Sequence, residues 1–163
     1  MIIIVEGPDG AGKSTLIKSM LKSHPGSTCK HFGSPKTDEE AFGYWKVYAQ
    51  AIEDTDPTTV TIFDRSWYSD VVYGPIFRNR LEMDPMHVKM LELMVQMHGG
   101  GHVIYCKAPI SVLWARCKKR GETYVLSKEK LTEVAKSYSS IMATQCRLPV
   151  IHYDTGTSLN KIW

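Results

Sequence analysis

The chain has 163 residues, of which 43% are apolar and 23% charged, as expected for an ordinary globular protein with a substantial core. A formal net charge of only +3, from 20 Lys and Arg against 17 Asp and Glu, argues against a surface that coats nucleic acid. The same balance suits a pocket for anionic small molecules. We expect a single domain over residues 1–163.

No stretch has the pattern of a signal peptide or of a membrane span. The four cysteines form neither a Cys-x-x-Cys pair nor a zinc-binding spacing, so we expect reduced thiols. These residues are Cys29, Cys106, Cys117 and Cys146. We therefore expect a cytoplasmic protein with no membrane partner.

Apolar runs that are typical of strands alternate along the chain with stretches that have helical periodicity. Taken in order, the predicted elements are a strand at 2–5, a helix at 13–22, a strand at 28–32, a helix at 39–53, a strand at 60–63, a broken helix at 67–80, a helix at 85–98, a strand at 102–106, helices at 109–120 and 127–145, and a strand at 149–154. This alternation predicts a parallel sheet with helices on both faces. Ligands of such sheets bind beyond the carboxyl ends of the strands.

The first strand ends in a glycine-rich turn that reads Gly7-x-x-x-x-Gly12-Lys13-Ser14, the phosphate-binding loop pattern. The glycines let the backbone wrap so that its N–H groups face a polyphosphate, and the following helix adds its positive dipole end. Lys13 supplies a cation for the outer phosphates, and the Ser14 hydroxyl is a ligand for Mg²⁺. The predicted nucleotide-binding residues are Gly7, Pro8, Asp9, Gly10, Ala11, Gly12, Lys13, Ser14 and Thr15.

The predicted helix at 39–53 carries several aromatic residues within a short span. Phe42 and Trp45 share a helical face with Tyr48. This face has two interpretations: a packed core stripe, or a wall on which a planar base stacks. We take Phe42 and Trp45 as candidate substrate-binding residues.

Two stretches resemble the motifs of thymidylate kinases, and the related deoxynucleoside kinases have a similar second stretch. The first runs from Glu6 to Thr15, and the second reads Asp64-Arg65-Ser-Trp-Tyr-Ser69-Asp-Val-Val-Tyr73. The resemblance implies a three-layer α/β fold of the P-loop nucleoside monophosphate kinase type, with five parallel strands in the order 2-3-1-4-5. It also implies ATP as phosphate donor, Mg²⁺ as cofactor, a deoxynucleotide acceptor and a homodimer formed through the helices after Arg65 and Pro85.

The resemblance assigns roles to residues of both motifs. Lys13 would hold the donor phosphates, Asp64 a water of the Mg²⁺ ion, and Arg65 the acceptor phosphate. Asp9 matches an acid near the acceptor sugar and the metal, and Tyr73 a tyrosine that packs under the sugar and disfavours a 2′-hydroxyl. The candidate acceptor residues are Asp9, Phe42, Trp45, Arg65, Ser69, Asp70 and Tyr73.

The stretch that begins Arg116-Cys-Lys-Lys-Arg120 resembles a short lid, which we place at about 116–126. Arg116 and Arg120 are one helical turn apart, so both can face the phosphates. In the family, such arginines stabilise charge on the transferred group, and the first can also stack on adenine. The candidate catalytic residues are thus Asp9, Lys13, Arg65, Arg116 and Arg120.

The sequence also departs from the thymidylate kinase pattern. An Arg-Glu-Pro-Gly-Gly stretch is replaced by 31–36, and no arginine lies between Lys13 and Arg65. Asp70 stands where a neutral polar residue is common, and its carboxylate would tolerate thymine but suit guanine, which offers two adjacent donors. The chain is short, as in small virus-encoded kinases, for which the location would be a host cytoplasm.

The leading hypothesis is therefore an ATP-dependent deoxynucleoside monophosphate kinase, with dTMP as the favoured acceptor. The alternatives are a deoxynucleoside kinase, a kinase for dGMP or another deoxynucleoside monophosphate, and a polynucleotide or modified-base DNA kinase. A nucleoside kinase would need a carboxylate base after the second strand, where only Asp38, Glu39 and Glu40 are available.

Overall fold

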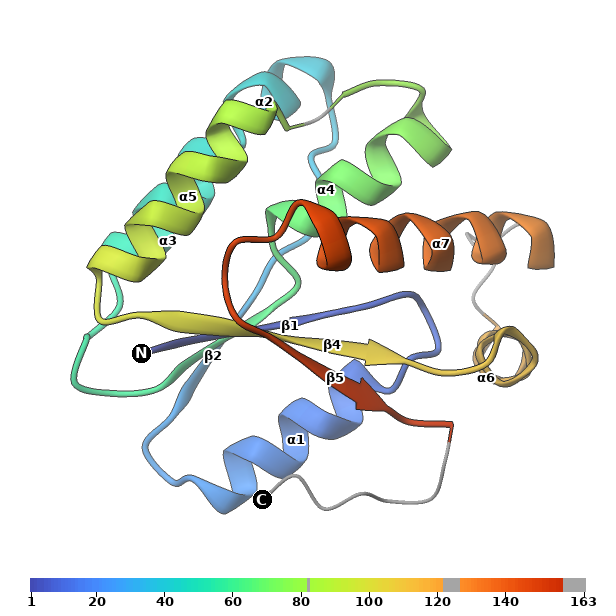
Figure 1. Cartoon of the computed structure of the whole chain (residues 1–163), viewed down its shortest axis with the longest axis horizontal. Helices are drawn as coiled ribbons and strands as arrows, with labels where there is room; N and C mark the ends of the chain where they lie inside the picture. The colour runs from blue at the N-terminus through green and yellow to red at the C-terminus, as the bar shows by residue number, and fades with distance from the viewer. Residues whose placement is uncertain (82, 122–126, 157–163) are drawn as a thin grey trace.

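A computed structural model describes residues 1–81, 83–121 and 127–156 (Figure 1). Its centre is a five-stranded parallel sheet with the strand order β2-β3-β1-β4-β5. The strands are β1 (Ile2–Glu6), β2 (Thr28–His31), β3 (Thr61–Asp64), β4 (Gly101–Lys107) and β5 (Val150–Asp154). The predicted P-loop nucleoside monophosphate kinase-like fold class and its strand order are confirmed.

Helices cover both faces of the sheet (Figure 1). They are α1 (Lys13–Ser23), α2 (Asp38–Gly43), α3 (Trp45–Glu53), α4 (Trp67–Tyr73), α5 (Pro85–Met97), α6 (Ile110–Arg120) and α7 (Lys128–Thr144). Buried residues of α3, α4, α5 and most of those of α7 pack on one face, and those of α1 and α6 pack on the other. Among the described residues, no helix is both long and apolar enough to cross a bilayer.

The central strand β1 shows why the sheet is covered on both sides. Successive side chains of a strand point to opposite faces, so Ile2 and Ile4 join the core beneath α3, α4, α5 and α7, while Ile3 and Val5 join the core beneath α1. Since all four are almost fully buried, the uninterrupted β-branched run is what a strand between two helical layers requires.

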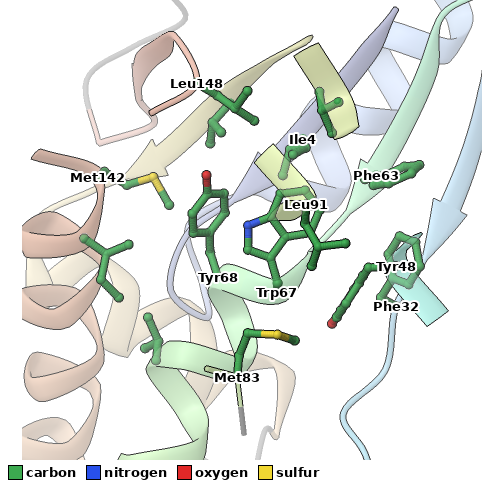
Figure 2. Close-up of a cluster of buried hydrophobic side chains, with 14 of the residues drawn as sticks. Ile4, Phe32, Tyr48, Phe63, Trp67, Tyr68, Met83, Leu91, Met142 and Leu148 are labelled. Carbon is green, nitrogen blue, oxygen red and sulfur yellow. The ribbon is translucent and has the colours of Figure 1, made fainter. Parts of the chain in front are cut away.

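The larger core is rich in aromatic rings (Figure 2). Trp67 and Tyr68 of α4 are fully buried, and the ring of Tyr48 from α3 packs edge-on against Trp67 at 5.8 Å. These contacts fix α4, and therefore the turn that precedes it, against the sheet.

Two predicted helices are divided in the structure. The predicted helix at 39–53 is two helices that meet at Tyr44, whose N–H donates to the carbonyl of Ala41, three residues back, so that the turn tightens. The segment predicted at 67–80 is α4 followed by a π-helical turn, Gly74–Arg78, which begins where Gly74-Pro75 interrupts the helix.

Candidate active site

The glycine-rich loop and the Asp64-Arg65-Ser66 turn leave the sheet side by side. They follow β1 and β3, which are neighbouring parallel strands in the register Val5 to Asp64. The carboxyl ends of parallel strands meet at one edge of the sheet, so both segments reach the same place, as the sequence predicts.

The glycines of the loop are required by close contacts as well as by backbone conformation. A Cβ atom on Gly7 would lie 2.2 Å from the carbonyl oxygen of Cys106 in β4. One on Gly10 would lie 2.6 Å from the carbonyl oxygen of Leu113 in α6, and the φ angle of Gly10 is +79°. The loop therefore wraps tightly between β4 and α6 because it lacks side chains at these positions.

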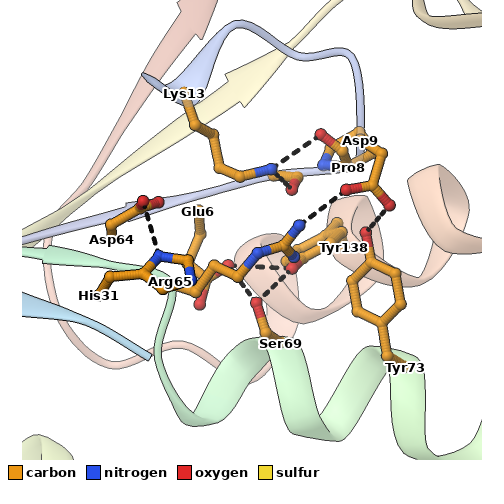
Figure 3. Close-up of polar contacts among 11 residues, drawn as sticks. Glu6, Pro8, Asp9, Lys13, His31, Asp64, Arg65, Ser69, Tyr73 and Tyr138 are labelled. Atoms are coloured by element: carbon orange, nitrogen blue, oxygen red, sulfur yellow. Dashed lines mark hydrogen bonds and ion pairs between the residues drawn. The ribbon is translucent and has the colours of Figure 1, made fainter. Parts of the chain in front are cut away.

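Lys13 lies at the start of α1, and its side chain turns back over the loop (Figure 3). Its Nζ donates to the carbonyl oxygens of Gly7 at 2.6 Å and Pro8 at 3.0 Å. Burial, with the nearby positive charge of Arg65, lowers the pKa of Lys13 to about 8, although Asp9 and Glu6 act in the opposite direction. The ammonium group is therefore held beside the loop and loses its proton more readily than an exposed lysine.

Arg65 and Asp9 form an ion pair that joins the two segments. The Nη2 of Arg65 donates to Oδ1 of Asp9 at 2.7 Å, and the Tyr73 hydroxyl donates to Oδ2 at 2.6 Å (Figure 3). Burial would raise the pKa of Asp9, but the charges of Arg65 and Lys13 outweigh it and lower this pKa. The guanidinium also lies 5.3 Å from the centre of the Tyr73 ring. The structure thus brings together three predicted site residues.

A cavity of about 160 Å³, here called the loop cavity, opens above the glycine-rich loop. Its lining residues are Asp9, Gly10, Ala11, Gly12, Lys13, Ser14, His31, Asp64, Arg65 and Arg120. Their backbone amides, lysine and arginines suit a polyphosphate.

The loop cavity also has the oxygen donors that a Mg²⁺ ion requires. Ser14, which carries a hydroxyl, and Asp64, which carries a carboxylate, are both lining residues, and Oδ2 of Asp64 lies 2.9 Å from Nδ1 of His31. Mg²⁺ prefers one or two protein oxygens completed by waters and phosphates. In residues 1–81, 83–121 and 127–156 there is no group of three or more His, Cys, Asp or Glu side chains that could hold a metal, and such a Mg²⁺ ion needs none.

A second cavity, of about 290 Å³ and here called the aromatic cavity, adjoins the first. Its lining residues are His31, Phe32, Gly33, Ser34, Tyr48, Arg65, Ser69, Asp70, Tyr73 and Arg78. His31 and Arg65 line both cavities. Arg65 therefore stands between a phosphate cradle and a cavity with aromatic walls.

The structure places the aromatic helix residues differently from the prediction. Phe42 is 90% exposed, and Trp45 stacks on His87 at 4.8 Å; neither is among the residues that line the aromatic cavity. The ring that reaches the cavity from this helix is that of Tyr48. Its hydroxyl donates to Oδ2 of Asp70 at 2.6 Å, so it fixes a predicted acceptor residue.

Sequence reasoning did not select His31 and Arg78. His31 ends β2, so the rule that ligands gather at the carboxyl ends of strands pointed to it. Arg78 ends the π-helical turn, and its position could not be derived from helical spacing because Gly74-Pro75 changes the helix there.

The two predicted lid arginines lie in different places. Arg116 donates to the carbonyl oxygen of Gly10 at 3.1 Å and to Oγ1 and the carbonyl oxygen of Thr155 at 2.9 and 2.8 Å, so it ties the loop to the end of β5. It is not among the lining residues of either cavity, whereas Arg120 lines the loop cavity. The rest of the predicted lid, 122–126, lies outside the described residues.

Fold and site together are those of a P-loop kinase, a phosphotransferase, with a glycine-rich loop that lines one cavity and a second cavity beside it. Residues 1–105 match the family described as Polyphosphate kinase 2 (PPK2). Since this match spans more than half of the chain, the chain belongs to the polyphosphate kinase 2 family. The two motifs resemble thymidylate kinases, but that narrower assignment stays a prediction. No curated protein sequence matches the chain.

Solved structures with the same fold include other kinases. YorR from Bacillus subtilis, solved in complex with phosphorylated GDP, is 22% identical with a TM-score of 0.78 over 95% of this chain and 86% of its own. Deoxyadenosine kinase from M. mycoides is 18% identical with a TM-score of 0.62, and the match covers 94% of this chain and 90% of the kinase chain. Polyphosphate Kinase 2 from Arthrobacter aurescens TC1 is 19% identical with a TM-score of 0.63. That match covers 94% of this chain but only 59% of the other chain.

The hydrogen bonds of Arg116 generate a prediction that separates structure from catalysis. We expect Arg116→Ala to lower the free energy of unfolding by about 1–3 kcal/mol, because the carbonyl groups that it binds lose a charged donor. Urea denaturation measures this change, and Lys119→Ala, an exposed cation of the same helix, should alter stability by less than about 0.5 kcal/mol. Unchanged stability of Arg116→Ala with lost turnover would instead support the catalytic role predicted from the sequence.

Proposed function

We propose that the protein transfers the terminal phosphoryl group of ATP to the 5′-phosphate of a deoxynucleoside monophosphate, giving the diphosphate. The observation that supports this most strongly is the position of Arg65, which lines both the loop cavity and the aromatic cavity. A guanidinium between two nucleotide phosphates can bind the acceptor phosphate with its planar fork of donors and offset charge as the transfer proceeds.

The loop cavity would hold the donor. The loop amides and Lys13 would bind the β- and γ-phosphates, and Arg120, which lines the same cavity, would stabilise charge on the transferred group. A Mg²⁺ ion bound at Ser14, with Asp64 holding one of its waters, would neutralise phosphate charge. Because the family is named for polyphosphate, polyphosphate is the competing donor.

The acceptor site favours a substrate that already carries a phosphate. Two of the three candidate bases for a nucleoside kinase have other partners: Asp38 pairs with Arg80, and Glu40 accepts from the backbone N–H of Lys36. Asp9 is paired with Arg65, and its lowered pKa makes it a poor proton acceptor. Arg65 would therefore bind the acceptor phosphate, and Asp38, Glu39 and Glu40 are not among the lining residues of the aromatic cavity.

The motif resemblance favours dTMP as the acceptor, with thymine as its base, and guanine is the second candidate base. The buried Asp70 carboxylate can accept from the two adjacent N–H donors of guanine, and Arg78, which lines the same cavity, can donate to its O6 and N7 atoms. YorR was solved with phosphorylated GDP, which makes a guanine nucleotide worth direct comparison.

Chromatographic measurement of the diphosphate formed from each deoxynucleoside monophosphate tests this function, with ATP or polyphosphate as donor in matched reactions. We expect turnover with dTMP or dGMP and ATP, and folded but nearly inactive Lys13→Ala and Arg65→Ala variants. If Asp70 reads guanine, Asp70→Asn lowers kcat/KM for dGMP about 10- to 100-fold relative to dTMP.

Three results would contradict the proposal. Absence of turnover with every monophosphate would contradict the proposed reaction. Activity with polyphosphate but not with ATP would show that polyphosphate is the donor. Retained activity in Lys13→Ala or Arg65→Ala would remove the assigned roles of these residues. An equal effect of Asp70→Asn on dGMP and dTMP would show that Asp70 does not select the base.

The lowered pKa of Lys13 predicts a pH dependence on the donor side. Below pH 8 the free enzyme carries a protonated Lys13, so kcat/KM for ATP should be level there and fall about tenfold per unit above that pH. Bound phosphates favour the charged lysine, so kcat should decline only at higher pH. Initial rates between pH 6 and 10 measure kcat/KM at low ATP and kcat at saturating ATP. A kcat/KM that stays level to pH 10 would contradict the assignment of Lys13 to donor binding.

A further inference from the structure

Glu6, the last residue of β1, is a fully buried carboxylate that accepts three side-chain hydrogen bonds (Figure 3). Oε1 accepts from the Ser66 hydroxyl at 2.8 Å. Oε2 accepts from the hydroxyls of Ser69 and Tyr138, each at 2.9 Å. These donors come from the residue that caps α4, from the first turn of α4, and from α7, so a single carboxyl group joins the central strand to two helices.

The residue between these attachments has an unusual backbone. Arg65 has φ of +71°, a left-handed conformation that residues with a Cβ atom adopt rarely and only where the surroundings fix it. Its N–H donates to the carbonyl oxygen of Val5 at 3.2 Å, and the next residue, Ser66, donates to Glu6. Two successive residues of β1 therefore hold the Arg65 turn from either side.

The carboxyl group of Glu6 lies near the cations of the site. Burial raises the pKa of Glu6, while its hydrogen bond from Ser66 and the charges of Arg65 and Lys13 act in the opposite direction. All three hydroxyl partners of Glu6 can donate to an ionised carboxylate, which has acceptor sites for each of them. The group is thus held as a hydrogen-bond acceptor for residues of two helices, beside the cations of the site.

We propose that Glu6 is a positioning residue for Arg65: it holds the strained Arg65 turn so that the guanidinium stays between the loop cavity and the aromatic cavity. This inference rests on the proposed function, in which Arg65 binds the acceptor phosphate. Glu6 lines neither cavity, so its effect reaches the acceptor through the turn. Loss of the oxygen that holds this turn should therefore weaken the acceptor step more than donor binding.

The test is Glu6→Gln, which keeps the volume but replaces one acceptor oxygen with an NH₂ donor. We expect kcat/KM for the monophosphate to fall about 10- to 100-fold, as for other residues that orient a ligand-binding group, with KM for ATP within about twofold. The same substitution in an Arg65→Lys background should cost less than about threefold, because residues that act through one another are not additive.

The chain offers a matched control in Glu92 of α5. This carboxylate is equally buried and accepts from the Tyr68 hydroxyl at 2.5 Å and from the backbone N–H of Arg147 at 2.9 Å. Glu92→Gln makes the same chemical change outside the two cavities, so it should change neither kcat/KM for the monophosphate nor KM for ATP. Tyr138→Phe is the second variant. It removes one donor and keeps the carboxyl group, and it should lower kcat/KM for the monophosphate, as Glu6→Gln does, with little change in KM for ATP.

A crystal structure of Glu6→Gln supplies a readout that does not depend on turnover. We expect the φ angle of Arg65 to become negative and its ion pair with Asp9 to be lost. An unchanged Arg65 turn, an equal loss for both substrates, or full additivity in the Arg65→Lys background would overturn the inference. No turnover with any monophosphate in the wild type would overturn the proposed function, while the Arg65 conformation in the variant would still decide whether Glu6 holds the turn.

Discussion

The ion pair between Arg65 and Asp9 is the contact on which the site depends. It joins the turn after β3 to the glycine-rich loop after β1, and it places a fixed positive charge at the border of two cavities. The pair is partly shielded from water, so its geometry is held more firmly than that of an ion pair on the surface. The parallel register of β1 and β3 brings these segments together before any ligand binds.

Most of the fold could be predicted from the sequence because the signals are local and strong. The β-branched run of β1 predicts a strand buried on both faces, and the glycine-rich loop predicts a strand, a turn and a helix in fixed order. The strand order itself came from the resemblance rather than from residue patterns. The sequence did not predict the divisions at Tyr44, where the helix tightens, and at Gly74, where it widens into a π-helical turn, because a single pattern spans both halves.

The site was predictable where a motif fixes position and less so where a helical face allowed two interpretations. Lys13, Ser14, Asp64 and Arg65 lie together as their motifs predict. Spacing alone could not decide which aromatic ring of the helix at 39–53 turns inward, and that ring is Tyr48. Such a choice depends on long-range packing, here on Trp67 and Phe32, which no local pattern reports.

The central claim is that two phosphorylated substrates meet at Arg65, and calorimetric titration with a bisubstrate compound tests it most directly. The compound joins adenosine and a deoxynucleoside through a chain of phosphates, so that it fills both cavities at once. The account predicts that it binds far more tightly than ATP or the monophosphate alone, and that Arg65→Ala removes most of this gain. An affinity no greater than that of ATP, or a gain that survives in Arg65→Ala, would contradict it.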